Sequence, residues 1–106
     1  MADVTCCNFD DFLRAMADKT RQRILSLLCE RAMSVSELAE QLFVAQPTIS
    51  HHLAILRRAN LVTVRREGRW RFYRANPACV MECCGAILAR FTSPLTTIAK
   101  AISDDG

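Results

Sequence analysis

Residues 46–74 read QPTISHHLAILRRANLVTVRREGRWRFYR. In the first half of this stretch, the apolar residues Ile49, Leu53 and Leu56 recur at helical spacing. In the second half, two short apolar runs flank the turn signal Glu67-Gly68, a pattern typical of a β-hairpin. The stretch therefore predicts a short helix followed directly by an antiparallel pair of strands.

The same stretch concentrates the positive charge of the chain. It holds seven of the 14 basic residues and a single acid, Glu67, although the net charge of the whole chain is only +3. The seven are Arg57, Arg58, Arg65, Arg66, Arg69, Arg71 and Arg74. A local basic face suits contact with phosphates, and the alternative is a solvated charged surface without a partner. A helix followed by a basic hairpin thus predicts a winged helix-turn-helix that binds DNA.

Three more helices are predicted before residue 46. Their apolar positions are Phe9, Leu13 and Met16 in the first, Ile24, Leu25, Leu27 and Leu28 in the second, and Val35, Leu38 and Leu42 in the third. Asp18 is the expected N-cap of the second helix, and Ser34 with Glu37 has the spacing of a capping box at the third. Pro47 marks the start of the fourth helix, because a first-turn residue needs no N–H.

Two helices are predicted after the hairpin, one opened by Asn76-Pro77 and one by Ser93-Pro94. Their apolar positions are Val80, Ile87, Leu88 and Phe91 in the former and Leu95, Ile98 and Ile102 in the latter. A monomer would leave much of this apolar surface exposed, so we expect a homodimer interface to cover it.

The length of 106 residues predicts a single domain over residues 1–106, mainly α with a β-hairpin wing. The chain shows neither a signal peptide nor an apolar run long enough to span a bilayer, so we expect a cytoplasmic protein. An enzyme is not expected. The sequence has no C-x-x-C pair, no catalytic triad candidate and no phosphate-binding glycine loop, and both histidines lie in the predicted recognition helix.

Four motifs carry a family resemblance: Ser34-Val-Ser-Glu-Leu, Gln46-Pro-Thr-Ile-Ser-His-His-Leu, Leu61-Val and Arg66-Glu-Gly-Arg. Together with the order of elements, they make nearly the whole chain similar to the arsenic-repressor (ArsR/SmtB) family of bacterial metal-sensing repressors. The resemblance implies a homodimer whose recognition helices enter successive major grooves of a partly palindromic operator, with the wings on flanking backbone. It also implies negative regulation, in which the apo dimer holds DNA and the inducer weakens that binding.

The exposed N-terminal end of the recognition helix is expected to read the DNA. The residues expected to bond bases or phosphates are Gln46, Thr48, Ser50 and His51. The residues expected to hold backbone phosphates are Arg57, Arg66 and Arg69. His52 lies near the inward stripe, where a packed histidine and a DNA contact are both open. Trp70 is expected to anchor the hairpin rather than to stack on a ligand.

Six cysteines lie outside residues 46–74: Cys6, Cys7, Cys29, Cys79, Cys83 and Cys84. In a reducing compartment, metal ligands or redox sensors are expected rather than a disulfide framework. The arsenic repressors that the chain resembles carry a cysteine cluster on the third helix, but residues 36–42 read SELAEQL. Zinc, cobalt and nickel sensors of that family open the helix after the wing with Asp-x-His, where this chain has Pro77-Ala-Cys79 and no histidine downstream. A zinc or nickel site is therefore not expected.

The remaining ligand set consists of thiolates, which favour soft ions. Cys79 and Cys83 share a helix face, and Cys84 is rotated from Cys83 by roughly a quarter-turn. A trigonal site is expected from Cys79, from Cys83 or Cys84, and from one N-terminal thiol, Cys6 or Cys7, of either subunit. We expect As(III) or Sb(III) as the inducer, because three thiolates neutralise a trivalent centre and because some arsenic-responsive relatives carry an N-terminal vicinal pair. Cd(II), Pb(II), Hg(II) and Cu(I) are the alternatives.

Cys29 ends an apolar run and is expected to be a core residue. The alternative is that Cys29 joins Cys6 and Cys7 as a ligand, because another subgroup of arsenic sensors that the chain resembles has a ligand near the end of this helix. Oxidation stays open as an alternative signal. Some relatives sense persulfide or peroxide by pairing a cysteine in the second helix with one late in the helix after the wing. Cys29 meets the first requirement, whereas no cysteine stands near Arg90 and Phe91 to meet the second.

Overall fold

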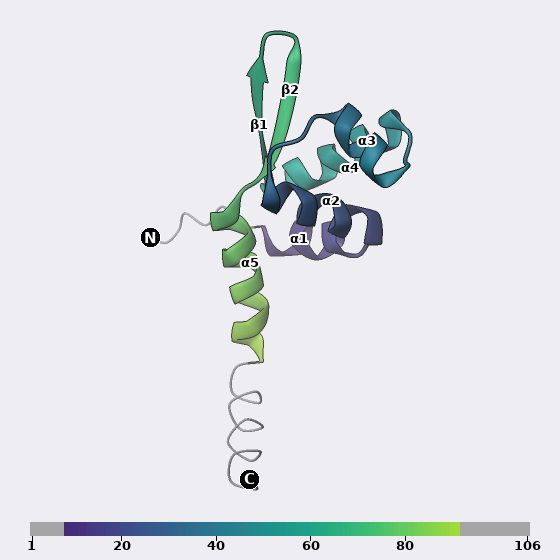
Figure 1. The fold of residues 1–106 in the computed structure, drawn as a ribbon. Coiled ribbons are helices and arrows are strands. Elements are labelled where there is room, and N and C mark those ends of the chain that lie inside the picture. The colour runs from purple at the N-terminus through teal and green to yellow at the C-terminus, as the bar shows by residue number, and fades with distance from the viewer. Residues whose placement is uncertain (1–7, 92–106) are drawn as a thin grey trace, which may run out of the picture.

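The computed structural model describes residues 8–91, which form five helices and one antiparallel hairpin (Figure 1). In chain order the elements are α1 (Phe9–Met16), α2 (Lys19–Glu30), α3 (Val35–Leu42), α4 (Gln46–Arg58), β1 (Val62–Glu67), β2 (Trp70–Ala75) and α5 (Pro77–Arg90). The expected winged helix-turn-helix is confirmed, with α3 and α4 as the helix-turn-helix and the hairpin as the wing. No helix in the described range is long and apolar enough to cross a membrane. The helix predicted from Ser93 lies outside the described residues.

Side-chain caps begin most of these helices. At α1, α2, α3 and α5, the capping side chain accepts a hydrogen bond from the backbone N–H three residues further on; the caps are Asn8, Asp18, Ser34 and Asn76. The helix α4 differs, because Ala45 precedes it without a side-chain bond and Pro47 stands in its first turn. The start of α4 is thus left without a side chain over it, at the end expected to face DNA.

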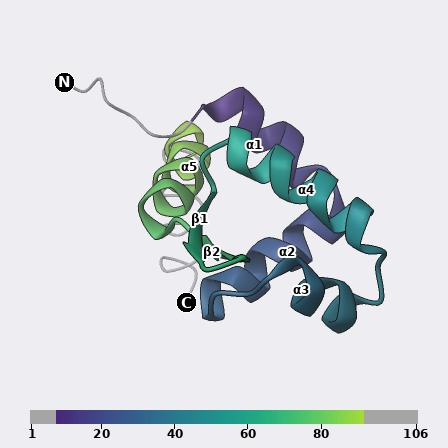
Figure 2. The same ribbon diagram turned by 90° about the horizontal axis from the view of Figure 1, so that it is seen from above.

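The helix α4 lies at the centre of the core. Its inward side chains Ile49, Leu53 and Leu56 are at most 1% exposed, and α4 contacts α1, α2, α3 and β1. Seen from above, α1 runs beside α4, and α2 and α3 lie on the other side of the molecule (Figure 2). The other elements surround α4 with the buried residues Phe12, Ala15, Ile24, Leu25, Leu28, Leu38, Leu42, Val62, Tyr73, Ala75 and Cys83.

The buried face of α1 differs from the prediction. Phe9 and Met16 pack partly buried against the core as expected, but Leu13 is 45% exposed. The fully packed positions are instead Phe12 and Ala15. An eight-residue helix offers two overlapping apolar stripes, and its contacts with α2 and α4 select which of them is buried.

The wing is fixed to the helices at its base. The strands β1 and β2 pair in register over their whole length, and Gly68 makes the turn with a φ of 63°. Near the base, Met33 and Tyr73 exchange two backbone hydrogen bonds with N–O distances of 2.9 and 2.8 Å. The Asn76 N–H donates to the Leu61 carbonyl at 2.8 Å. From this base the hairpin projects to one side of the helices while α5 extends to the other (Figure 1).

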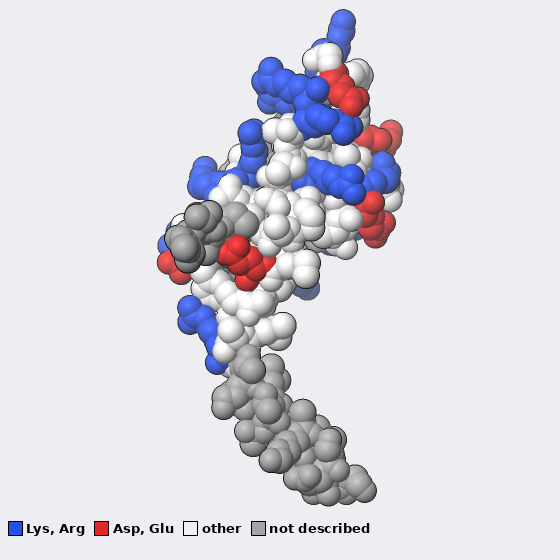
Figure 3. Space-filling model, turned by 90° about the vertical axis from the view of Figure 1, so that its left-hand side faces the viewer, with Lys and Arg blue, Asp and Glu red and all other residues white. Residues whose placement is uncertain are grey.

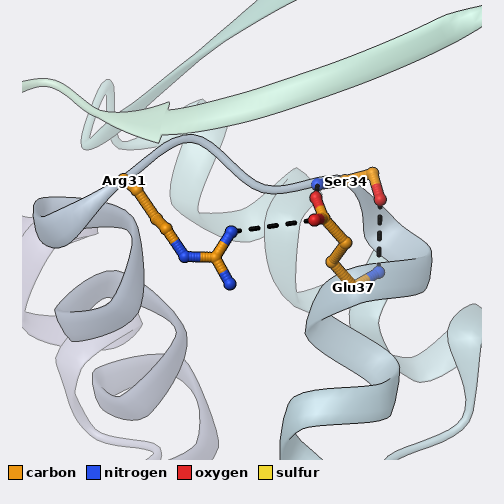
Figure 4. Close-up of polar contacts among 3 residues, drawn as sticks. All are labelled: Arg31, Ser34 and Glu37. Carbon is orange, nitrogen blue, oxygen red and sulfur yellow. Dashed lines mark hydrogen bonds and ion pairs between the residues drawn. The ribbon is translucent and has the colours of Figure 1, made fainter.

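The helix α3 begins at the capping box predicted from the sequence. The Glu37 N–H donates to Ser34 Oγ at 3.2 Å, and the Ser34 N–H donates to Glu37 Oε1 at 2.9 Å (Figure 4). Arg31 Nη1 lies 3.7 Å from Glu37 Oε2, but both side chains are exposed, so this ion pair adds little. The hydroxyl of the buried Ser34 therefore carries most of the stabilisation at this helix start.

We expect the Ser34→Ala substitution to lower the free energy of unfolding by about 1 kcal/mol, because it removes the N-cap acceptor of α3. Urea denaturation followed by circular dichroism measures this change. The control is Ser36→Ala at an exposed position of α3, with an expected change below about 0.5 kcal/mol. Equal losses in the two variants would contradict the capping role.

Candidate nucleic-acid interface and thiol cluster

The N-terminal end of α4 presents a polar face outside the core. The side chains predicted to contact bases or phosphates are all exposed there: Gln46, Thr48, Ser50 and His51. Each carries groups that can donate or accept hydrogen bonds, which is what recognition of base edges and phosphates requires. The structure thus brings these four residues together on one accessible end of the helix.

A groove lies between α4 and the wing. Ser50 and Arg57 of α4 line one side of it, and Arg71 and Tyr73 of β2 line the other. Two guanidinium groups from different elements therefore border one groove, an arrangement suited to an anionic backbone. Arg57 is a predicted phosphate contact, whereas Arg71 is not among those predicted. Strand alternation could have identified it, because Arg71 stands two residues before the buried Tyr73 and so on the same face.

The turn of the wing is also basic. Arg66 and Arg69, both predicted phosphate contacts, are exposed. Figure 3 shows Lys and Arg side chains gathered at the hairpin end of the molecule. Trp70 is 56% exposed beside them, so the expectation that it anchors the hairpin is wrong. Tyr73, at 9% exposure, anchors the hairpin instead, because the strand pairing places it at the base of the wing.

His52 is packed and does not lie on the exposed face of α4. Its side chain is 9% exposed, and its Nδ1 lies 3.1 Å from Arg21 Nη1. Burial lowers the pKa of His52; the Asp18 carboxylate acts in the opposite direction, and Arg21 and His51 add to the lowering. The pKa of Asp18 is itself lowered, first by the hydrogen bond from the Arg21 N–H. Of the two possibilities that the sequence left open, the packed histidine is the one observed.

Two cysteines of α5 are completely buried. Cys79 and Cys83 have 0% exposure and stand one helical turn apart, whereas Cys84 is exposed. Asn76, the cap of α5, contacts Cys79 twice: its Oδ1 accepts from the Cys79 N–H at 3.4 Å, and its Nδ2 donates to Sγ at 3.3 Å. Cys79 and Cys83 are both disulfide-bonded in the structure, whereas Cys29 and Cys84 are free. The buried face of α5 thus carries two cysteines one helical turn apart, each in a disulfide bond.

Cys29 is exposed, contrary to the prediction of a core residue. The buried positions of α2 are Ile24, Leu25 and Leu28. Each further residue of a helix turns by about 100°, so the residue after Leu28 points away from the core. An apolar run in the sequence therefore extends one residue beyond the buried face.

A complete metal site is not formed by the described residues alone. Within residues 8–91, no group of three or more His, Cys, Asp or Glu side chains could hold a metal ion. Cys79 and Cys83, which are disulfide-bonded in the structure, would offer two thiolate sulfurs only after reduction, and Cys84 of the same helix is turned to solvent. These residues fit a thiophilic ion in part, and a third ligand has to come from elsewhere. Cys6 and Cys7, the other predicted ligands, lie outside the described residues.

The helix α5 packs on α1 and also carries exposed apolar side chains. The Arg90 guanidinium lies 4.5 Å from the centre of the Phe9 ring. On the outside of α5, Met81 is 74% exposed, and Phe91, directly after the helix, is 54% exposed. Large exposed apolar groups at one helix are typical of a protein interface.

Known proteins share both sequence and fold with this chain. A sequence profile described as bacterial regulatory protein, arsR family, matches residues 18–64. The HTH-type transcriptional regulator KmtR of Mycobacterium tuberculosis is 46% identical over 74 residues, which cover 70% of this chain and 57% of KmtR. The arsenical resistance operon repressor of Escherichia coli strain K12 is 42% identical over 65 residues, which cover 60% of this chain and 56% of that repressor. The chain thus spans little more than half the length of these two relatives.

A solved structure matches over more of the chain. An ArsR-like transcriptional regulator from Rhodococcus sp. RHA1 superposes with a TM-score of 0.72 at 30% sequence identity, and the match covers 92% of each chain. The similarity therefore includes the helix-turn-helix, the wing and the helices on either side of them.

We expect Arg71→Gln to weaken binding to duplexes of different sequence alike. A plot of the logarithm of the association constant against the logarithm of the salt concentration has a negative slope. Its magnitude should decrease by about 0.9, the value for one lost phosphate contact. Fluorescence anisotropy of a labelled duplex over a series of salt concentrations measures the slope. Arg23→Gln makes the same change of charge in the groove between α2 and α3, and it should leave the slope unaltered. An unaltered slope for Arg71→Gln as well would place Arg71 away from the DNA.

Proposed function

Because this chain belongs to the ArsR family of bacterial regulatory proteins, we propose that it is a DNA-binding repressor released from its operator by As(III) or Sb(III). The observation that carries the choice of inducer is the pair Cys79 and Cys83, buried one turn apart on a helix without histidine. Thiolate ligands favour thiophilic ions. The similarity to an arsenical resistance operon repressor also supports a metalloid.

The DNA-binding half of the proposal uses α4 and the wing. The uncapped, polar end of α4 enters the major groove, where Gln46, Thr48, Ser50 and His51 contact bases or phosphates. Arg57 and Arg71 hold the backbone that enters the groove between α4 and β2. Arg66 and Arg69 extend these phosphate contacts along the wing.

A homodimer fits this use of the fold. Two copies related by a two-fold axis place two α4 helices in successive major grooves, which gives an operator with two half-sites. The exposed Met81 of α5 and Phe91 beside the helix supply apolar surface for the subunit contact. Pairing through α5 brings Cys79 and Cys83, which we call the thiol cluster, close to the subunit contact. An ion bound there can change the relative position of the subunits.

The inducer site is built around the buried thiols of α5. In the reduced protein, Cys79 and Cys83 hold the ion, and a third thiolate comes from Cys6 or Cys7 of either subunit. Three thiolates neutralise a trivalent centre, so the site can be buried at little cost in net charge. The Nδ2–H of Asn76, which donates to Cys79 Sγ, favours the negatively charged sulfur that a metalloid needs. Cys84 is exposed on the same helix and is the less suited ligand.

Release follows from linkage between the two sites. The ion must prefer the dimer conformation that fits DNA poorly, by about 1–3 kcal/mol for a typical allosteric coupling. DNA then weakens ion binding by the same factor. No residue of α4 or the wing is a cysteine, so this coupling is carried by packing and not by a ligand shared between the two sites.

A second candidate function is release by oxidation of thiols. The specific observation in its favour is that Cys79 and Cys83 are disulfide-bonded in the structure. Oxidation would consume the thiolates that the metalloid needs, so the two signals compete for the same sulfur atoms. The two candidates therefore predict different inducers and the same essential residues.

Titration of the operator complex with candidate inducers tests the proposal. We expect arsenite and antimonite to release the reduced wild-type protein, because both bind several thiolates at once. In Cys79→Ser and Cys83→Ser, the antimonite concentration that releases half of the protein should rise at least about tenfold. Even the loss of a residue that only hydrogen-bonds to a metal ligand weakens metal binding by that factor. Cys29→Ser, at an exposed thiol of α2, is the control and should respond to arsenite and antimonite as wild type does; a higher concentration for half-release would instead make Cys29 a ligand. Fluorescence anisotropy of a labelled operator is the measurement.

Each alternative inducer gives a different outcome in the same titration. Release by Cd(II) and not by the metalloids would replace the inducer with a divalent soft ion. Release by a persulfide donor alone would establish the oxidation candidate. Normal release of both serine variants by antimonite would remove Cys79 and Cys83 from the site altogether.

We expect Met81→Glu to shift the protein from dimer to monomer and to weaken operator binding, because it buries an unpaired charge at the proposed subunit contact. Sedimentation velocity measures the mass. Phe43→Glu changes another exposed apolar residue, 94% exposed in the turn between α3 and α4, and should leave the mass unchanged. A Met81→Glu protein that remains dimeric would place the subunit contact elsewhere.

A further inference from the structure

One guanidinium group connects the end of α1 to the recognition helix. Arg21 Nε donates to the Ala15 carbonyl at 2.8 Å, and Nη2 donates to the Arg14 carbonyl at 3.2 Å. Its Nη1 lies 3.1 Å from Nδ1 of His52 on α4, 31 residues away in the sequence. A single side chain of α2 thus bonds to both α1 and α4.

The direction of the bond between Arg21 and His52 fixes the state of the imidazole. A guanidinium has only donors and stays protonated, so Nδ1 of His52 has to be the acceptor. His52 is therefore neutral, with its proton on Nε2, whenever this bond is present. An imidazolium would place an N–H and a positive charge against the guanidinium and would break the bond.

This connection lies between the thiol cluster and the DNA-facing end of α4. The helix α5, which carries Cys79 and Cys83, packs against α1, and the carbonyls bonded by Arg21 belong to the last turn of α1. On α4, His52 directly follows the exposed His51. A displacement of α5 that moves α1 therefore reaches the recognition helix through Arg21.

We propose that Arg21 and His52 are positioning residues that pass a shift of α1 to the recognition helix and so couple the thiol cluster to operator binding. This relay rests on the proposed inducer-released repressor. In the DNA-binding state, the three bonds of Arg21 hold α4 in the orientation that fits the major groove. An ion bound at α5 moves α1, weakens these bonds and frees α4 to leave that orientation.

The relay also makes operator affinity depend on pH. The charged groups around His52 are Asp18 and Arg21 at the start of α2 and His51 on α4, and α1 contributes the backbone carbonyls bonded by Arg21. Burial lowers the pKa of His52, so the neutral acceptor is present at neutral pH. Its contribution is complete above the ordinary pKa of 6.5 and is lost as the pH falls through the lowered pKa of the folded protein. Operator affinity should fall over the same interval.

Two substitutions of His52 distinguish the effect of its hydrogen-bond acceptor from the effect of its packing. Asn places an acceptor close to the position of Nδ1 and does not titrate, whereas Leu fills the space without an acceptor. Operator binding of the reduced protein is measured with and without antimonite over a pH series that starts at about 7.5 and continues below about 5.5, because the pKa of His52 lies below its ordinary value. We expect His52→Asn to bind as wild type at the start of this series and to lose the pH dependence. His52→Leu should bind about tenfold more weakly, the effect of losing one hydrogen bond to a charged group.

The coupling itself is the ratio of operator affinities without and with antimonite. We expect this ratio to fall about tenfold in His52→Leu, within the range of allosteric couplings. Arg21→Lys is the matched variant because it keeps the charge. One ammonium group cannot replace the guanidinium that bonds α1 and α4 at the same time, so the ratio should fall in this variant as well. Thermal melts by circular dichroism establish that each variant is folded. His51→Gln should bind more weakly and still lose affinity as the pH falls, with the fall at a higher pH than in wild type, because one of the groups that lower the pKa of His52 is removed.

The outcomes distinguish the relay from the proposed function. If antimonite releases the wild-type protein and both His52→Leu and Arg21→Lys keep the wild-type ratio, the relay is wrong. If antimonite fails to release even the wild-type protein, the proposed inducer is wrong, and the pH dependence then decides the relay by itself. In that case, a His52→Asn protein with the wild-type pH dependence overturns it.

Discussion

The helix α4 has to bury one face completely and leave its N-terminal end free, and the rest of the structure is arranged around that constraint. Ile49, Leu53 and Leu56 are at most 1% exposed, and α1, α2, α3 and β1 all contact this one helix. A core that closes around the recognition helix fixes its orientation without using the side chains that face outward. Small movements of the surrounding helices therefore change how α4 is presented.

Features encoded by residues close together in sequence could be predicted from it. The capping box of Ser34 and Glu37 and the inward stripe of α4 depend on spacings of three or four residues, and both occur as expected. The buried face of α1 could not be predicted in the same way. Leu13 and Phe12 satisfy helical periodicity equally, and only the packing against α2 and α4 selects Phe12. The predictions that Cys29 is a core residue and that Trp70 anchors the hairpin were wrong for the same reason, because tertiary packing decides which side chains are exposed.

Some features of the candidate site could likewise be predicted from sequence spacing, whereas others depend on the fold. The spacing of Cys79 and Cys83 identifies two thiols on one face of α5, and their complete burial agrees with it. The hydrogen bond from the Asn76 amide to the Cys79 sulfur could not be predicted, because in the sequence Asn76 has the position of an ordinary N-cap. The bond between Arg21 and His52 spans 31 residues and has no sequence signal at all. Sequence patterns thus locate the chemical groups, whereas their partners require the fold.

The connections of α5 give a physical route by which the proposed ligand at Cys79 and Cys83 would act on both α4 and the wing. At its start, Asn76 bonds the sulfur of Cys79 and also donates its backbone N–H to Leu61 at the base of the wing. Along its length α5 packs on α1, whose last turn is bonded to the recognition helix through Arg21. A change in the geometry around the Cys79 sulfur would therefore act on the wing directly and on α4 through two intervening helices. Because the two paths begin on the same helix, the wing and the recognition helix would respond together to the proposed ligand, and neither would have to carry a ligand of its own.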